Sequence, residues 1–139
     1  MSSPGIGLSN ILEAEGVIRG SSGWTASFGG STDGINEVGI IDSGGAGGEV
    51  KVAIDYPSVQ MIVQGSSGNG GYIATVNKAR EIYNTLMGID TPNADYDELV
   101  SCVALNFPAW LGRGDQGQPR FSLNFRLIIE PNDIGNRPY

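Results

Sequence analysis

Side chains suited to catalysis are few in this chain of 139 residues. It contains no histidine, which excludes Ser-His and Cys-His nucleophile pairs and imidazole metal ligands. Carboxylates gather in one polar stretch that also contains proline, at Asp90, Asp95, Asp97 and Glu98. Because paired carboxylates act as acid and base in glycosidases, a carboxylate-dependent hydrolase is one alternative for this chain. A solvated linker is the favoured interpretation of the stretch.

Metal and cofactor sites find little support in the sequence. The acidic stretch has Pro92 inside it and lacks the glycine of an EF-hand turn, so we expect no metal site. Residues 65–71 are rich in glycine, like a phosphate-binding loop. However, Tyr72 and Ile73 follow Gly71, where a P-loop has Lys and then Ser or Thr. A connector between a strand and a helix is favoured there, and we expect no cofactor.

Two further motifs have structural interpretations. Cys102 lies among apolar residues, which predicts a buried thiol, and one cysteine cannot form a disulfide within its own chain. The tripeptide Arg113-Gly114-Asp115 occurs in adhesion ligands, but in a glycine-rich turn it indicates polar turn residues or contacts across an assembly interface. Trp110 follows a predicted strand, so it either folds back on the core or projects to a partner.

Composition restricts the class of partner. The net charge is −7 and the pI about 4.3, whereas tight nonspecific nucleic-acid binding needs clustered Lys and Arg. The length fits a single domain over residues 1–139, with the abundant glycine marking flexible loops near 44–48 and 65–71. The sequence has no apolar run long enough to span a membrane, and its first residues do not resemble a secretory signal. We expect a soluble intracellular product.

The first half of the chain is expected to contain one helix and three or four strands. Ser3 and the proline after it suit the start of a helix that ends near residue 16, although Gly5 and Gly7 each weaken it by about 1 kcal/mol. The glycines of residues 44–48 are expected to break regular structure completely. Alternating and apolar segments predict strands at 24–28, 36–42 and 59–64, and a strand or an extended arm at 49–56.

A longer amphipathic helix is predicted from residue 72 to residue 87. Apolar side chains recur in it at steps of three or four, which places them on one face. They are Tyr72, Val76, Ala79, Ile82, Tyr83 and Leu86. Gly88 is expected to end the helix, and residues 90–97 form an acidic linker.

The most regular pattern lies in the last third of the chain. A strand is predicted at residues 99–107, ended by Pro108. From 120 to 130, apolar and polar side chains alternate, which is typical of a half-buried strand. Its apolar face consists of Phe121, Leu123, Phe125, Leu127 and Ile129. The two strands form a hairpin-like pair with a wide glycine-rich tip at 108–119, and the polar tail at 131–139 lies extended outside the core.

The order of these elements predicts the fold class. A helix, two or three strands, a second helix and two final strands suggest an α/β (α+β) fold. We expect one mixed, mostly antiparallel β-sheet with two helices packed on one face. The last strand should be central or well paired, because its five apolar side chains need cover.

Three segments, in this order, resemble one known family. Residues 56–63 place a proline before a strand, and residues 79–86 form a helix with a Tyr-x-x-Leu core. Residues 108–117 form a turn with Arg, Asp and Gly, and Phe-Ser-Leu-Asn-Phe follows at 121–125. Over residues 56–130, the chain resembles the tail-terminator and minor capsid proteins of tailed phages.

The resemblance implies a structural virion protein rather than an enzyme. It implies a hexameric ring at the neck, which caps the tail tube, ends tube polymerisation and joins the tail to the head-side connector. The implied partners are copies of the chain itself, the tail tube protein and the connector or neck protein. Genome DNA would pass through the ring without specific binding, and an acidic lumen would repel its phosphates. Synthesis would take place in the host cytoplasm.

We expect the assembly interface at the hairpin tip and in the glycine-rich loop before the second helix. The residues concerned are Trp110, Arg113, Asp115, Arg120, Gly68 and Asn69. Two alternatives within the virion are another neck or head–tail adaptor protein and a tail-tube subunit. A tube subunit would need larger sheets for stacking than this chain's strands provide. The hydrolase alternative depends on Asp95 and Asp97.

Overall fold

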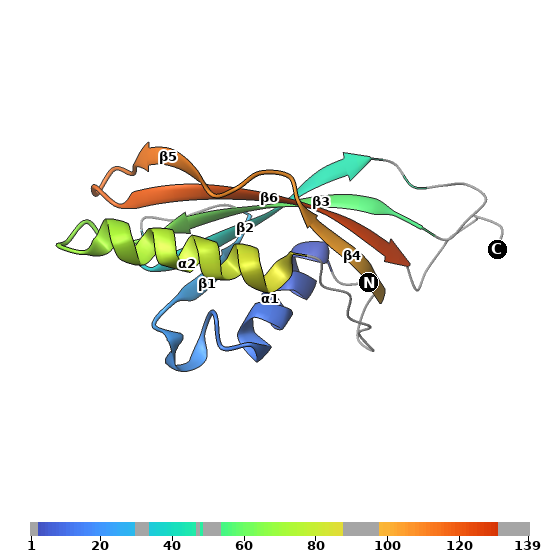
Figure 1. The fold of residues 1–139 in the computed structure, drawn as a ribbon, viewed down its shortest axis with the longest axis horizontal. Coiled ribbons are helices and arrows are strands. Elements are labelled where there is room, and N and C mark those ends of the chain that lie inside the picture. The colour runs from blue at the N-terminus through green and yellow to red at the C-terminus, as the bar shows by residue number, and fades with distance from the viewer. Residues whose placement is uncertain (1–2, 30–33, 47, 49–53, 88–97, 131–139) are drawn as a thin grey trace.

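The strands of this protein form one mixed sheet of six strands, and two helices pack on one of its faces (Figure 1). The computed structural model describes residues 3–29, 34–46, 48, 54–87 and 98–130. In chain order the elements are helix α1 (Pro4–Ala14), 3-10 helix η1 (Gly20–Ser22), strands β1 (Thr25–Phe28), β2 (Glu37–Ala46) and β3 (Tyr56–Gln64), helix α2 (Gly71–Leu86), and strands β4 (Glu98–Ala104), β5 (Ala109–Arg113) and β6 (Pro119–Glu130). The predicted fold class is confirmed.

The sheet has the order β1-β2-β3-β6-β4, and β5 also pairs with β6. β1 and β2 are parallel, whereas the other pairs are antiparallel. β6 therefore lies between β3 on one side and β4 and β5 on the other. The prediction that the last strand is well paired is confirmed.

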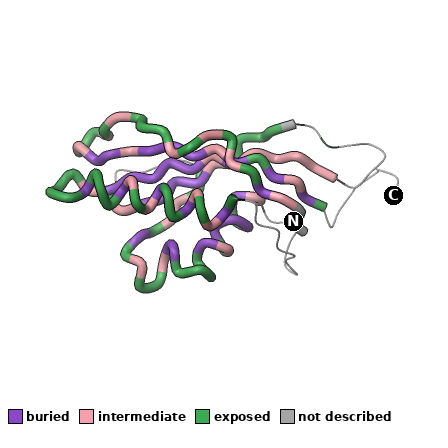
Figure 2. The backbone as a smooth tube through the Cα atoms, in the orientation of Figure 1, coloured by how far each residue is buried: buried purple, intermediate pink, exposed green. Residues whose placement is uncertain are grey.

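The core lies between the sheet and the helices, and Figure 2 shows buried residues along the central strands and on the inner faces of the helices. The alternation predicted for β6 is confirmed, because all five residues of its apolar face are at most 7% exposed. β3 contributes Val59, Met61 and Val63, which are fully buried. From the helices come Leu8, Leu12, Ala79, Ile82 and Leu86.

Helix α1 begins as the sequence predicts. The Ser3 side chain accepts a hydrogen bond from the backbone N–H of Ile6 at 3.1 Å, which caps the helix. Gly5 is buried, and a Cβ atom placed there would lie 2.8 Å from Cγ2 of Ile40. The glycine that weakens the helix in isolation therefore lets it lie close against β2.

The prediction that residues 44–48 break regular structure is wrong for the first three of them. β2 continues through Gly44 and Gly45 to Ala46, with a bulge after Asp42. Gly45 has φ +96, and a Cβ atom there would collide with the backbone of β3. Glycine permits this bulge, and pairing with β3 supplies the order that local propensity lacks.

The predicted apolar stripe of α2 needs one correction. Tyr72 is 46% exposed, whereas Thr75 is fully buried and donates a hydrogen bond from its hydroxyl to the carbonyl oxygen of Gly71 at 2.6 Å. This bond satisfies the threonine hydroxyl, so a polar residue occupies a core position where an apolar one was expected.

Several predictions fall on residues that the structure does not describe. They are the end of α2 at Gly88, the linker at 90–97, the tail at 131–139 and most of the arm at 49–56. Among the described residues, no helix has the length and apolarity that crossing a membrane requires.

Candidate assembly surface

The strand predicted at residues 99–107 ends at Ala104, and the prediction of a hairpin tip at 108–119 is wrong for its first part, which contains strand β5. β4 pairs with β6 up to Ala104, and the backbone N–H of Leu105 still donates to the carbonyl oxygen of Asn124 at 2.7 Å. The chain then leaves the ladder until β5 begins at Ala109. Asn106 bridges the break. Its Oδ1 accepts a hydrogen bond from the backbone N–H of Asn124 at 3.0 Å, and its Nδ2 donates one to the carbonyl oxygen of Ser122 at 3.2 Å. The side-chain amide of Asn106 thus supplies hydrogen-bond partners to two backbone groups of β6 at the gap between β4 and β5.

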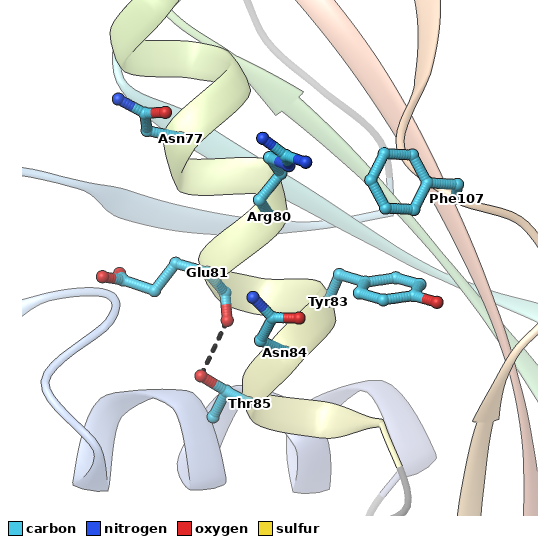
Figure 3. Close-up of a pocket in the computed structure, with 7 residues that line it drawn as sticks. All are labelled: Asn77, Arg80, Glu81, Tyr83, Asn84, Thr85 and Phe107. Atoms are coloured by element: carbon cyan, nitrogen blue, oxygen red, sulfur yellow. Dashed lines mark hydrogen bonds between the residues drawn. The ribbon is translucent and has the colours of Figure 1, made fainter.

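The break places Phe107 outside the sheet, over helix α2. Its ring lies edge-on to that of Tyr83, with centroids 5.2 Å apart, and the guanidinium carbon of Arg80 is 5.5 Å from its centroid. Phe107 is nevertheless 57% exposed. These residues line an open groove of about 570 Å³, drawn in Figure 3. The groove is polar along α2, where the other lining residues are Asn77, Glu81, Asn84 and Thr85.

Trp110 both folds back and faces outward. It lies opposite Phe121 in the ladder, with ring centroids 5.4 Å apart, and 5.5 Å from the ring of Tyr72. It is still 48% exposed, and the guanidinium carbon of Arg113 lies 5.9 Å from its centroid. The sequence allowed Trp110 either to fold back on the core or to project outward. In the structure one part of the side chain packs on Phe121 and the rest is exposed.

Two loops far apart in the sequence meet at the end of the sheet where β6 begins. The backbone N–H of Gly65 donates to the carbonyl oxygen of Pro119 at 3.0 Å. A Cβ atom on Gly117, whose φ is +80, would lie 3.2 Å from Cβ of Ser67. Figure 1 shows the turn between β5 and β6 beside the start of α2. The glycine-rich loop before α2 and the hairpin turn therefore form one surface.

All six residues predicted for the interface lie at or near this surface. Arg113, Asp115, Gly68 and Asn69 are exposed, as is Trp110. Arg113 donates to the carbonyl oxygen of Gly117 at 2.9 Å, which fixes the turn. Arg120 is half-buried, and its Nε has no hydrogen-bond partner among the described residues. The structure thus brings the predicted residues together.

Sequence reasoning missed several exposed apolar residues along the same side of the sheet. Leu105, Phe107 and Leu111 flank the break and are 56%, 57% and 46% exposed. Together with Trp110 and Tyr72 they make up what we call the aromatic edge. The sequence contained a signal for these residues. Pro108 indicated the end of a strand, and aromatic residues stand on either side of it.

Catalytic chemistry finds no support among the described residues. No three acidic or cysteine side chains there lie close enough to hold a metal ion. Burial raises the pKa of the Cys102 thiol from 9.0 to about 12, so it stays protonated near neutral pH. The prediction of a buried thiol is confirmed. Asp90, Asp95 and Asp97 lie outside the described residues, as does the side chain of Glu98.

Comparison with known proteins decides the family. A family model described as "Bacteriophage tail terminator protein" matches residues 14–131, which include all six strands and α2. The chain belongs to the phage tail terminator family. The resemblance noted for residues 56–130 is confirmed, and it extends to residue 14. A search of curated proteins gave no match.

A tail terminator is a structural component of the phage tail. Family membership therefore gives this chain a place in the tail of a virion and implies contacts with other tail or head proteins. It also suggests that the chain is not an enzyme. Exposed side chains at the end of the sheet and along the aromatic edge are available for contacts of this kind.

Proposed function

We propose that this tail terminator forms a hexameric ring that caps the tail tube, ends its polymerisation and joins the tail to the head-side connector or neck protein. The family match over residues 14–131 is the observation that carries the proposal. The whole chain, 1–139, acts as one domain, which is made in the host cytoplasm and incorporated at the neck of the virion.

The surface of the subunit supports a role in assembly. Half-exposed aromatic residues such as Phe107 and Trp110 are costly to leave in water, and aromatic and arginine side chains are enriched at interface hot spots. Each lies beside an exposed arginine, Arg80 or Arg113. A cap needs such surfaces for its neighbours in the ring and for the tube below it.

Charge supports free passage of DNA through the ring. With a net charge of −7, the protein carries few of the clustered cations that hold phosphates. We propose that acidic side chains face the lumen, where like-charge repulsion keeps the genome from binding. A ring map with a basic lining would contradict this part of the proposal.

The six residues at the end of the sheet are proposed to contact neighbouring subunits or the tube. A Trp110→Ala, Arg113→Ala double variant removes one aromatic anchor and one cation from this surface. We expect it to form few rings and to leave tails of irregular length. If the double variant gave normal rings and normal tails, Trp110 and Arg113 would not belong to the interface.

The experiment that tests the proposed function is loss of the protein from the phage. In an infection where its coding sequence is disrupted, negative-stain images should show overlong tail tubes and heads without tails. Supplying the wild-type chain in trans should restore both. Tails of normal length that fail to join heads would favour a head–tail adaptor, and an absence of tubes would favour a tube subunit. Either result would reject the terminator role.

A further inference from the structure

The aromatic edge lies at one border of the sheet. β4 and β5 follow one another along the outer side of β6, so they form that border. Leu105, Phe107, Trp110 and Leu111 are each at least 46% exposed there. Arg80 and Arg113 stand over two of the rings. An apolar strip with cations beside it therefore runs along this side of the molecule.

The opposite border of the sheet carries a second exposed apolar group. β1 is the border strand on that side, and its last residue, Phe28, is 48% exposed. Ile35, which precedes β2, is 60% exposed. The guanidinium carbon of Arg19 lies 5.9 Å from the centroid of the Phe28 ring, and Arg19 also pairs with Glu13 at 3.0 Å. Arg19 thus links the end of α1, through Glu13, to β1, through Phe28. We call this surface the β1 edge.

The two edges differ in charge. The ion pairs Arg19–Glu13 and Lys78–Glu81 are each neutral in sum. Apart from them, the described side chains of the aromatic edge include two arginines, Arg80 and Arg113, against one carboxylate, Asp115 in the adjoining turn. Glu15 is exposed at the C-terminal end of α1, two residues beyond the Glu13 that Arg19 links to Phe28, and the helix dipole adds further negative potential there. Counted over the residues that the structure describes, one edge is thus mildly basic and the other acidic.

We propose that the aromatic edge of one subunit docks on the β1 edge of the next copy of this chain. The inference rests on the proposed ring and names the surfaces that build it. Two different patches on opposite borders of one sheet make a head-to-tail contact, which repeats by rotation until the ring closes. Docking of two identical aromatic edges would set Arg80 and Arg113 of both copies against each other. The charge pattern therefore selects a second copy in head-to-tail orientation.

Two variants, each with one edge blocked, test the proposal. Phe107→Asp places a carboxylate in the aromatic edge, and Phe28→Asp places one in the β1 edge. Both side chains are about half exposed, so the core stays intact. We expect each variant alone to lose ring formation, with self-association at least about 30-fold weaker than that of the wild type. Arg126→Asp is the matched control, because Arg126 is exposed on the face of β6 that points away from the core.

Mixing the two blocked variants gives the decisive result. Phe28→Asp protein retains an aromatic edge and Phe107→Asp protein retains a β1 edge, so an equimolar mixture should form one junction and stop. Sedimentation or mass photometry should then show a 1:1 dimer, while the Arg126→Asp control forms rings like the wild type. Circular dichroism melts confirm that all variants are folded.

Other outcomes would overturn the assignment of the edges. If wild-type rings form and the Phe28→Asp variant still makes them, the β1 edge is not the docking surface, although the ring itself stands. If both variants form rings but tails with Phe107→Asp fail to join heads, the aromatic edge binds another virion protein instead. Wild-type protein that stays monomeric and gives no cross-linked oligomer at high concentration would count against both the edges and the ring.

Discussion

A single side chain, Asn106, governs the shape of the candidate surface. Its amide replaces a missing stretch of strand, because Oδ1 accepts from the backbone N–H of Asn124 and Nδ2 donates to the carbonyl oxygens of Ser122 and Phe107. Without these bonds, part of β6 would lack partners in a largely buried setting. The residues around Asn106 can therefore leave the sheet and present Phe107 to solvent.

We expect Asn106→Ala to destabilise the fold by about 1–3 kcal/mol, because it leaves backbone groups of β6 unsatisfied. Urea unfolding followed by circular dichroism measures the loss. Asn84→Ala is the matched control, since Asn84 is exposed on α2, and we expect its effect to stay within about 0.5 kcal/mol. Equal stabilities for the two variants would show that the bridge contributes nothing.

Among the elements, α1 shows how packing overrides intrinsic propensity. Glycine disfavours a helix, yet Gly5 is buried at the place where α1 approaches β2. Its backbone N–H also donates to Oδ1 of Asp42 at 2.8 Å, so the first turn of the helix is tied to the strand. The close approach and this hydrogen bond both depend on the absence of a side chain at Gly5.

We expect Gly5→Ala to lower the thermal stability of the protein although it raises helix propensity. The added methyl group would lie 2.8 Å from Cγ2 of Ile40 and 3.0 Å from Oδ1 of Asp42, and such overpacking costs about 1–3 kcal/mol. The propensity gain of about 1 kcal/mol offsets only part of this cost. Scanning calorimetry measures the change.

The comparison for this prediction is Ala74→Gly, at an exposed position of α2. There the helix propensity acts alone, and the loss should be about 1 kcal/mol. A Gly5→Ala protein more stable than the wild type would show that α1 moves away from β2 at little cost.

At the scale of the whole molecule, the subunit is a single layer of sheet covered on one face, with two borders of different character. Such a shape has surfaces left for neighbours, as a tail terminator requires. The Asp90 to Glu98 stretch is the one remaining place where the sequence suggested chemistry. Its role distinguishes an assembly subunit from a hydrolase.

We expect an Asp95→Ala, Asp97→Ala double variant to retain full assembly and to support normal tails, because a solvated linker tolerates the loss of two carboxylates. Ring formation and the titre of phage supplied with the variant are the measurements. Release of reducing sugar from polysaccharide by the wild type, lost in the variant, would support the hydrolase alternative instead.

The sequence by itself determined most of the sheet strands, both helices, the fold class and the family, but it did not predict β5. Period-two alternation in residues 120–130 and the three-to-four spacing in α2 are local patterns, and burial of one face follows directly from them. It also indicated that Cys102 is buried, whereas the assembly role of residues near the hairpin turn stays a prediction.

Only the tertiary structure decided the features that depend on partners distant in the sequence. The strand through Gly44 and Gly45 exists because β3 pairs with it, and the ring of Tyr72 lies against the rings of Trp110 and Phe121, which come much later in the chain. The break at Asn106 and the resulting aromatic edge arise from hydrogen bonds to β6, 16 and 18 residues away. Local propensity cannot encode such bonds, because their energy appears only when the two segments meet.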